Sequence, residues 1–303
     1  MAISRQQLAK ELEPGLNALF GLEYNSYENQ HAEIFDTETS DRAFEEEVML
    51  SGFGEAAVKA EGSAVSFDSA NESFTARYNH ETIALAFSIT EEAVEDNLYD
   101  SIAKRYTKAL ARSMAQTKQI KAANILNNAF SVTTVSGDKQ FLIDNDHPTI
   151  GGGNQSNRPT TLADLSETSL EQAMIDIAAF KDERGLKIAA RGMKLIIPSA
   201  NQFNAERILK SNQRVGTSDN DLNALASKGM LPQGYVVNNF LTDSDAFFIK
   251  TDVPNGLKHF QRAALKTAME GDFDTGNMRY KARERYSFGA SDWRGIYGSD
   301  GSA

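Results

Sequence analysis

Residues 264–298 read ALKTAMEGDFDTGNMRYKARERYSFGASDWRGIYG and carry the clearest indication of the fold. Apolar and β-branched or aromatic residues lie on both sides of residues 271–277, where glycine, aspartate and asparagine gather. This arrangement predicts a strand, a turn, a second long strand and a short final strand. Trp293, the single tryptophan, is expected to be a buried anchor near the last strand. The end of the chain is therefore expected to be strand-rich.

The block before it, about 140–262, alternates predicted helices and strands. A helix is expected from about Thr168 to Arg184, because Thr168 and Glu171 have capping-box spacing and Gly185 suits a C-cap. A buried strand at 193–197 should stop at Pro198. The further expected elements are helices at about 201–210 and 219–227, the latter ended by Gly229, and strands near 235–237 and 246–250. Such alternation around one core is typical of an α/β domain.

A long helix is predicted over residues 90–130, which contain no Gly or Pro. About 40 helical residues would span roughly 60 Å, a length that suits a spine. Acidic residues crowd its start and basic residues its later turns, which complements the helix dipole. Apolar residues that recur every four positions are expected on one stripe: Val94, Leu98, Ile102, Tyr106, Leu110 and Met114.

Residues 56–89 predict a long β-hairpin, because apolar and polar residues alternate on both sides of a polar tip at 68–73. A lone two-stranded ribbon is marginal in water. It must therefore lie on its own domain or on another subunit. Upstream, two short helices separated by Pro14-Gly15 are expected, followed by an extended polar arm over 25–47.

Charge is unevenly distributed along a chain whose net charge is −11. Residues 1–100 carry five Lys/Arg and 21 Asp/Glu, a balance of −16, while residues 101–130 carry six basic residues and no acidic ones. The two regions could be separate solvated faces, or they could face each other in different copies and fix register. The second arrangement predicts that assembly weakens in molar salt. The acidic total argues against tight duplex binding through the basic stretch.

Known catalytic and ligand-binding patterns are missing from the sequence. There is no cysteine, no G-x-S-x-G elbow, and no Lys-Ser/Thr after the glycine cluster at 151–153. Asp144, Asp146 and His147 could in principle hold a metal, although a turn before Pro148 explains them better. The chain also lacks an apolar run of membrane-spanning length and a signal peptide. We therefore expect no enzymatic activity, no cofactor and no metal.

The closing stretch quoted above resembles the C-terminal strands of tailed-bacteriophage major capsid proteins. The middle of the chain resembles the Mu-type major head subunit in three features. An apolar segment and an Asp/Asn-rich turn end in His147-Pro148; a helix carries KDERG at 181–185; and KLIIP at 194–198 precedes a helix ending in ILKS at 208–211. The resemblance covers about 140–300, and residues 48–135 agree in organisation only.

The resemblance implies an α+β fold of the tailed-phage capsid type, which is shared with encapsulins. Its parts would be an N-terminal arm (1–47), an extended loop hairpin (48–89), a peripheral domain with the spine helix (90–135 and 263–303) and an axial domain (136–262). Copies would form hexamers and pentamers that close into an icosahedral virion shell, assembled in the host cytoplasm around double-stranded DNA that is bound without sequence specificity. A separate scaffolding protein, a portal and a decoration protein are the other partners it implies.

Phenylalanine and basic side chains are expected at the subunit interface. Phe67, Phe74 and Phe87 should dominate its contact energy, because a buried Phe contributes roughly 1.5–3 kcal/mol. The candidate interface residues are Phe67, Phe74, Arg77, Lys104, Arg105, Lys108, Arg112 and Arg285. An encapsulin-type nanocompartment shell remains the first alternative and a soluble α/β enzyme the second.

Overall fold

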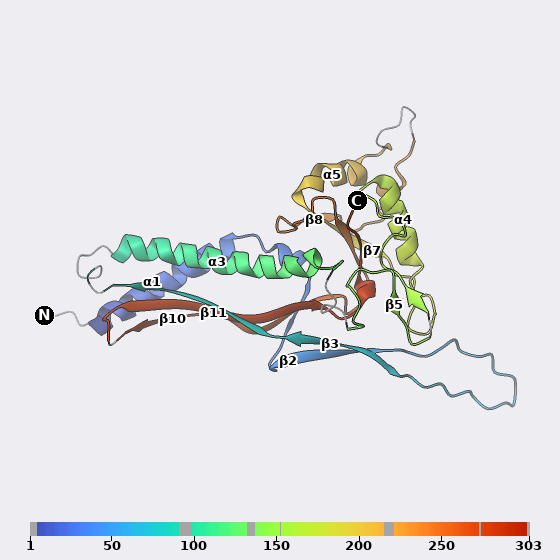
Figure 1. Ribbon diagram of the computed structural model, residues 1–303, viewed down its shortest axis with the longest axis horizontal. Helices are drawn as coiled ribbons and strands as arrows, with labels where there is room; N and C mark the ends of the chain where they lie inside the picture. Colours follow the sequence, from blue (N-terminus) through green and yellow to red (C-terminus); the bar gives the residue numbers. More distant parts are fainter. Residues whose placement is uncertain are drawn as a thin grey trace.

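The computed structural model describes residues 5–90, 92, 99–131, 137–151, 153–214, 221–272 and 274–301, without the side chains of 5–12 and 99–102. The molecule has a long layered body, a block standing at one end of it, and a narrow two-stranded ribbon that projects from their junction (Figure 1). Helices and sheets both contribute, so the α+β class predicted from the sequence is confirmed.

The long body is built on a four-stranded sheet in the order β1-β10-β11-β4. Its strands are β1 (Asp36–Thr39), β4 (Glu81–Ile89), β10 (Leu257–Gly271) and β11 (Met278–Ala290). β10 and β11 pair antiparallel from Leu257 opposite Ala290 to Gly271 opposite Met278. The amide of Gly276, at a φ of 69° that favours glycine, donates to the carbonyl of Asp272 in the connecting turn. The strand–turn–strand prediction is therefore confirmed.

Two helices, α1 (Arg5–Ser26) and α3 (Tyr99–Asn127), lie over one face of this sheet. They bury Leu16, Phe20, Leu110 and Met114 against Tyr280 and its neighbours. The predicted long helix is confirmed over Tyr99–Asn127, while Val94, Leu98 and the side chain of Ile102 lie outside what the structure describes. Of the remaining stripe, Leu110 and Met114 are buried, but Tyr106 is 52% exposed. A helix turns every 3.6 residues, so a strict four-residue recurrence drifts around it. Five alanines contribute to the buried face of α3, namely Ala103, Ala111, Ala115, Ala122 and Ala123.

The block at the end of the body contains a second four-stranded sheet in the order β12-β9-β7-β8. Its strands are β7 (Gly192–Ile197), β8 (Tyr235–Val237), β9 (Phe247–Thr251) and β12 (Ile296–Ser299), and its helices are α4 (Glu167–Ala178), α5 (Gln202–Lys210) and α6 (Ala224–Lys228). These bounds confirm the predicted strands and the helix near 201–210. The helix expected at 219–227 is shorter, because residues 221–223 precede it without being helical, and residues 219–220 lie outside the described part of the chain. α4 is shorter than expected: Ser166 caps its start and Gly185 lies in a later turn.

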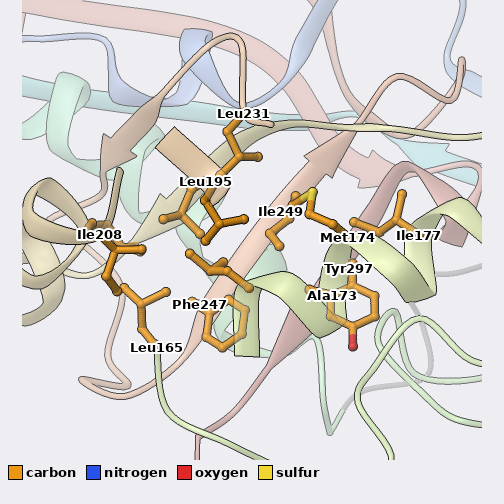
Figure 2. Close-up of a cluster of buried hydrophobic side chains, with 14 of the residues drawn as sticks. Leu165, Ala173, Met174, Ile177, Leu195, Ile208, Leu231, Phe247, Ile249 and Tyr297 are labelled. Atoms are coloured by element: carbon orange, nitrogen blue, oxygen red, sulfur yellow. The ribbon is translucent and has the colours of Figure 1, made fainter. Parts of the chain in front are cut away.

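Hydrophobic clusters cover both faces of this second sheet. One cluster packs Leu170 and Ile177 of α4 and Ile208 of α5 against Leu195 and Ile249 (Figure 2). The other packs Ile34, Phe35 and the end of α3 against Ile196, Phe248 and Ile296. The remaining short elements are η1 (Gln30–Glu33), β5 (His147–Pro148), β6 (Asn154–Gln155), η2 (Ser199–Asn201) and η3 (Trp293–Gly295). The second cluster ties the block to the long body.

The ribbon differs from the predicted hairpin over 56–89. It pairs β2 (Phe44–Leu50) with β3 (Glu72–Asn79), and residues 51–71 form a long tip loop that turns at Glu61-Gly62. β4 instead pairs with β11 in the long sheet. The expected polar tip at 68–73 is therefore wrong, and so is the expected strand around residues 65–67. β4 leaves the ribbon because its alternating apolar side chains, such as Ile83 and Phe87, pack against α3 and Tyr280.

The N-terminal third is also more ordered than expected. α1 is a single helix that contains Pro14, and Ile34 and Phe35 are buried, so residues 30–39 are not a free arm. At the other end of the chain, β12 joins the sheet of the block rather than that of the long body. The division into arm, loop, peripheral and axial domains with the stated boundaries stays a prediction.

Candidate functional site

Among the described residues, no helix is both long and apolar enough to cross a membrane. The same residues contain no group of three or more side chains of metal-ligating type. A 620 Å³ pocket beside α4 is lined by three methionines, two glycines and the charged residues Arg191, Lys228 and Asp252, among others. The chemically distinctive features are the ribbon, the junction on which it rests, and the charged faces around them.

The base of the ribbon is fixed to the long body by buried polar contacts. Lys258 of β10 is nearly buried and forms ion pairs with both Glu38 of β1 and Glu47 of β2. Tyr78 of β3 packs edge-on against Phe260, with ring centroids 4.8 Å apart, and its hydroxyl contacts Ser291. Charge-assisted bonds of this kind are stronger than neutral ones. The base of the ribbon therefore belongs to the subunit's own structure.

A second attachment lies further along the ribbon, which we call the clasp. It joins Asp68 of the tip loop to Arg184, which follows α4 in the block, with Nη1 3.2 Å from Oδ1. Arg184 Nη1 also donates to the carbonyl of Ser69, and the backbone amide of Gly54 donates to Asp68 Oδ2. The Ser69 amide also donates to Asp68, at Oδ1. The bonds from the Gly54 and Ser69 amides, and after them the charge of Arg184, stabilise the carboxylate and lower the pKa of Asp68. The clasp is exposed to solvent, where an ion pair contributes about 0–1 kcal/mol, so it can open.

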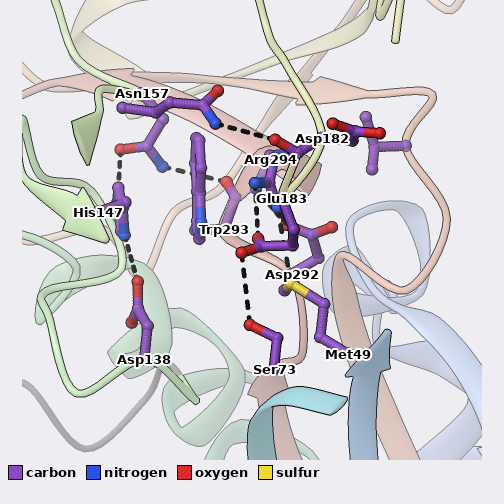
Figure 3. A network of polar contacts seen from close by, with 12 residues as sticks. Met49, Ser73, Asp138, His147, Asn157, Asp182, Glu183, Asp292, Trp293 and Arg294 are labelled. Atoms are coloured by element: carbon purple, nitrogen blue, oxygen red, sulfur yellow. Dashed lines mark hydrogen bonds and ion pairs between the residues drawn. The ribbon is translucent and has the colours of Figure 1, made fainter. Parts of the chain in front are cut away.

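A buried ion pair between Arg294 and Glu183 lies where the ribbon, the block and the long body meet (Figure 3). Arg294 Nη2 lies 2.7 Å from Glu183 Oε1, and Arg294 Nε donates to the carbonyl of Lys181. Glu183 Oε2 accepts from the amide of Ile150 and from the hydroxyl of Ser73 on β3. Both charges are desolvated, so removing either side chain would leave the other charge buried without a counter-ion and would strongly destabilise the fold. This junction positions the ribbon relative to the block.

A second set of contacts in the junction surrounds Trp293, which is buried as predicted. His147 stacks on its ring at 4.4 Å, with Nδ1 2.6 Å from Asp138 Oδ2 and Nε2 3.1 Å from Asn157 Oδ1. Asn157 Nδ2 donates to the carbonyls of Leu142, Trp293 and Ile296. His147 therefore makes a structural hydrogen-bond network and does not gather Asp144 and Asp146 into a ligand set.

The tip loop exposes large apolar side chains to solvent. Phe67 is 98% exposed, Val58 is 100% exposed, and Phe53 and Val65 are exposed by 63% and 64%. Glu55 and Glu61 of the same loop are exposed and have no ion-pair partner among the residues that the structure describes. A clustered set of exposed apolar side chains is typical of an interaction surface.

The candidate aromatic interface residues have different surroundings. Phe67 lies in the tip loop, whereas Phe74 is half-buried within β3. Phe87 packs on Tyr280 and Tyr106 inside the long body, with centroids 5.5 and 5.7 Å away, so the expectation that it lies at an interface is wrong.

The candidate basic residues lie mostly within the subunit's own contacts. Arg77 covers the ring of Phe44 and pairs with Glu46 across the ribbon. Lys104, Arg105, Lys108 and Arg112 follow the exposed side of α3, and Lys108 pairs with Glu23 of α1. Arg285 donates to the carbonyls of Ala43 and His80 at the base of the ribbon. Whether any of these residues contacts another subunit remains a prediction.

Four titratable side chains that are distant in sequence meet beneath α3. The His31 and His259 rings are 5.4 Å apart, and Lys118 lies 3.5 Å from Glu284. Burial, with Lys118 adding to it, lowers the pKa of His31 to about 4 and that of His259 to about 3. Burial also raises the pKa of Glu284. In the sequence these histidines appear scattered, and no local signal indicates that they meet.

The two histidines should therefore make the subunit less stable as the pH decreases from 6.5 toward 4, whereas the raised pKa of Glu284 acts in the opposite direction. Below the unfolded pKa the unfolded histidines bind protons that the folded cluster excludes, so protonation favours unfolding. Urea unfolding of the unassembled subunit across this range measures the effect. His31→Phe keeps an aromatic ring there and should make the midpoint less dependent on pH. Identical pH slopes for the variant and the natural chain would contradict the assignment.

Comparison with known proteins identifies what this arrangement resembles. The family model described as phage capsid protein matches residues 73–299. No curated protein matches the chain. The procapsid of bacteriophage JBD30 is similar at 13% identity and a TM-score of 0.52, covering 98% of this chain and 76% of that one. A virus-like particle from Pyrococcus furiosus is similar at 12% identity and a TM-score of 0.51, covering 94% and 97% of the two chains. The capsid of an empty GTA particle is similar at 13% identity and a TM-score of 0.52, covering 91% of each chain.

Proposed function

The chain belongs to the phage capsid protein family, and we propose that it assembles as hexamers and pentamers into the icosahedral head of a tailed bacteriophage. Family and fold make it a structural capsid protein of the virion. The finer assignment, to the Mu-type head and to a shell around double-stranded DNA, is part of the proposal. The expected assembly in the host cytoplasm belongs to it as well.

The observation that carries the proposal is the ribbon. Its base is fixed by Lys258 and Tyr78, but its tip loop carries Phe53, Val58, Val65 and Phe67 away from the subunit's own core (Figure 1). An isolated subunit gains nothing from four exposed apolar side chains. Burial against a neighbour would contribute roughly 1.5–3 kcal/mol for each Phe. A shell of many copies supplies such a neighbour for every ribbon.

The remaining parts are assigned by their place in the fold. The long body with α3 would be the peripheral domain, and the block with α4 to α6 would surround the capsomer axis as the axial domain. The buried junction would fix the block relative to the ribbon, because Arg294 bonds to Lys181 and Thr251 of the block while Glu183 accepts from Ser73 of β3. A net charge of −11 suits a container whose DNA must pack without adhering to the wall. A separate scaffolding protein, a portal and a decoration protein are the other proposed partners.

An encapsulin-like nanocompartment shell is the second candidate, and the similarity to a virus-like particle favours keeping it. Both shells would use the same fold, so the contents of purified particles distinguish them. DNA inside supports the phage head, and an enclosed cargo enzyme supports the nanocompartment. The third candidate, a soluble α/β enzyme, has no observation in its favour.

The full-length chain should form capsomers or closed shells when it is expressed together with its scaffolding partner. Size-exclusion chromatography with light scattering measures the mass of the product, and negative-stain microscopy shows its symmetry. Particles with hexameric and pentameric units are the expected outcome. A chain that stays monomeric at high concentration with the scaffold supplied would contradict the proposal.

A further inference from the structure

A pocket on the block collects three of the chain's eight methionines. Met174 belongs to α4, Met193 to β7, and Met230 follows the end of α6. Met174 is buried, whereas Met230 is 37% exposed, so the three side chains extend from the floor of the pocket to its mouth. Its volume of 620 Å³ lies within the usual range of ligand pockets, about 300–1,000 Å³. We call it the methionine pocket.

The backbone of β7 forms one wall of the methionine pocket. Gly192 lies so close to Met174 (labelled in Figure 2) that a Cβ at this position would be 2.8 Å from Met174 Cε. Ala178 and Ala190 also line the pocket, and neither side chain is large enough to fill it. Methionine side chains adapt to irregular apolar shapes and make favourable sulfur contacts with aromatic rings. The lining therefore suits a bulky apolar side chain, and an aromatic one best.

The rim of the methionine pocket has an excess of positive charge. Arg191 and Lys228 are exposed and have no ion-pair partner among the residues that the structure describes. Asp252, the third charged residue of the lining, is bound to the backbone: its Oδ1 accepts from the Arg191 amide at 2.8 Å, and its own amide donates to the Arg191 carbonyl. One cation is thus in excess there, on a chain of net charge −11. Complementary charge favours an acidic occupant.

The methionine pocket continues into a second hollow in the direction of the ribbon. Ala190 and Asp252 also line this neighbouring hollow of 310 Å³, whose other walls include Ile188, Val253 and Pro254. Ile188 is 37% exposed there. An extended peptide can place one side chain in the first hollow and continue through the second, whereas a compact small molecule would occupy only one of them.

We propose that the methionine pocket binds an extended acidic segment of a second protein. The segment inserts an aromatic side chain among the methionines and places carboxylates beside Arg191 and Lys228. An aromatic anchor in a desolvated pocket is the kind of contact that dominates binding energy. The inference goes beyond the proposed shell, because it concerns a protein other than this chain.

The phenylalanines that this chain exposes most are poorer occupants. Phe203 is 71% exposed, but its neighbours in the chain are uncharged. Phe67 is 98% exposed and is followed by Asp68, but that carboxylate is already bound to Arg184. Neither phenylalanine offers a free carboxylate next to the ring.

Binding can be measured on the unassembled full-length subunit with a fluorescent peptide in which aspartates flank one phenylalanine. Fluorescence anisotropy gives the affinity, and NMR of labelled methionine methyl groups identifies the site. The methyl signals of Met174, Met193 and Met230 should shift, whereas that of Met114 in the long body should not.

Charge reversal tests the rim. Arg191→Glu with Lys228→Glu should weaken binding of this peptide by about tenfold or more and should favour a peptide with lysines in place of the aspartates. Arg105→Glu with Arg112→Glu on α3 is the matched control, because these cations are exposed and distant from the pocket, and it should bind like the natural chain.

Blocking the pocket tests the aromatic anchor separately from charge. Ala178→Trp places a large ring at the last residue of α4, on the pocket wall, and should abolish binding. Ala179→Trp is the control, because Ala179 is also exposed but does not line the pocket. Thermal unfolding shows whether both variants are folded.

Three results would overturn the inference. Equal affinity for the aspartate and lysine peptides would show that the rim does not select an acidic segment. Methyl shifts with decanoate but not with the peptide would assign the pocket to a free apolar anion. Tighter binding of a peptide with the sequence of residues 52–70 would make a second copy of this chain the occupant. Failure of the unaltered chain to form shells would refute the proposed function and leave this binding unaffected.

Discussion

Replacing Glu183 with alanine is expected to lower the free energy of unfolding of the unassembled subunit by about 3–5 kcal/mol. The variant leaves the guanidinium of Arg294 buried without its counter-ion, because both side chains are almost fully enclosed. It also removes the acceptor for the amide of Ile150 and the hydroxyl of Ser73. Urea unfolding followed by circular dichroism measures the loss.

The matched control is an ion pair on the surface of the same subunit. Arg77 and Glu46 lie 3.7 Å apart with about half of each side chain exposed, and Glu46→Ala should cost about 0–1 kcal/mol. Replacing both buried partners, with Glu183→Leu and Arg294→Met, should recover much of the stability because no lone charge remains. If Glu183→Ala is no more costly than Glu46→Ala, the junction does not depend on this pair.

The α/β block could be predicted from its sequence because its signals are local. Pro198 stops β7, and Gly229 ends α6 in the left-handed conformation with φ 58°. Both residues act through their own backbone geometry, whatever the rest of the fold. The end of α4 was predicted too far downstream, because the chain leaves the helix to place Glu183 in the junction rather than in response to a helix stop signal.

The ribbon could not be derived from alternation alone. Val65 and Phe67 alternate with polar residues as a strand would, but no strand among the described residues pairs with them. The strand that pairs with β3 is β2, whose acidic residues Glu45, Glu46 and Glu47 suggested a solvated arm. Pairing is a property of two segments, and the hydrophobic pattern of one segment does not identify its partner.

The junction was missed for a related reason. Arg294 and Glu183 are 111 positions apart, and His259 lies far from His31, so no spacing rule connects them. Only Trp293 gave a local signal, because a single tryptophan near the last strand is expected to be buried. The exposed tip of the ribbon, in contrast, follows directly from the phenylalanines that the sequence places in a polar segment.

Replacing Phe53 and Phe67 with serine is expected to abolish shell assembly while leaving the subunit folded. The two side chains are 63% and 98% exposed, so their loss should change the free energy of unfolding by no more than about 0.5 kcal/mol. In the shell each would be buried, and the pair would contribute roughly 3–6 kcal/mol per subunit. That difference raises the concentration needed for assembly by about a hundredfold or more.

A Phe→Ser substitution on another face tests whether assembly depends on the tip loop itself or only on the total exposed apolar surface. Phe203 on α5 is 71% exposed, and Phe203→Ser should assemble at nearly the natural concentration. Phe74→Ser offers the opposite contrast, since that side chain is half-buried in β3 and its loss should weaken the subunit itself.

Light scattering gives the assembly threshold, and hydrogen exchange reports whether residues 52–70 become protected in the shell. A tip variant that unfolds as a monomer would place Phe53 and Phe67 in the subunit's own core. One that assembles normally would show that neighbouring subunits are held together by other surfaces.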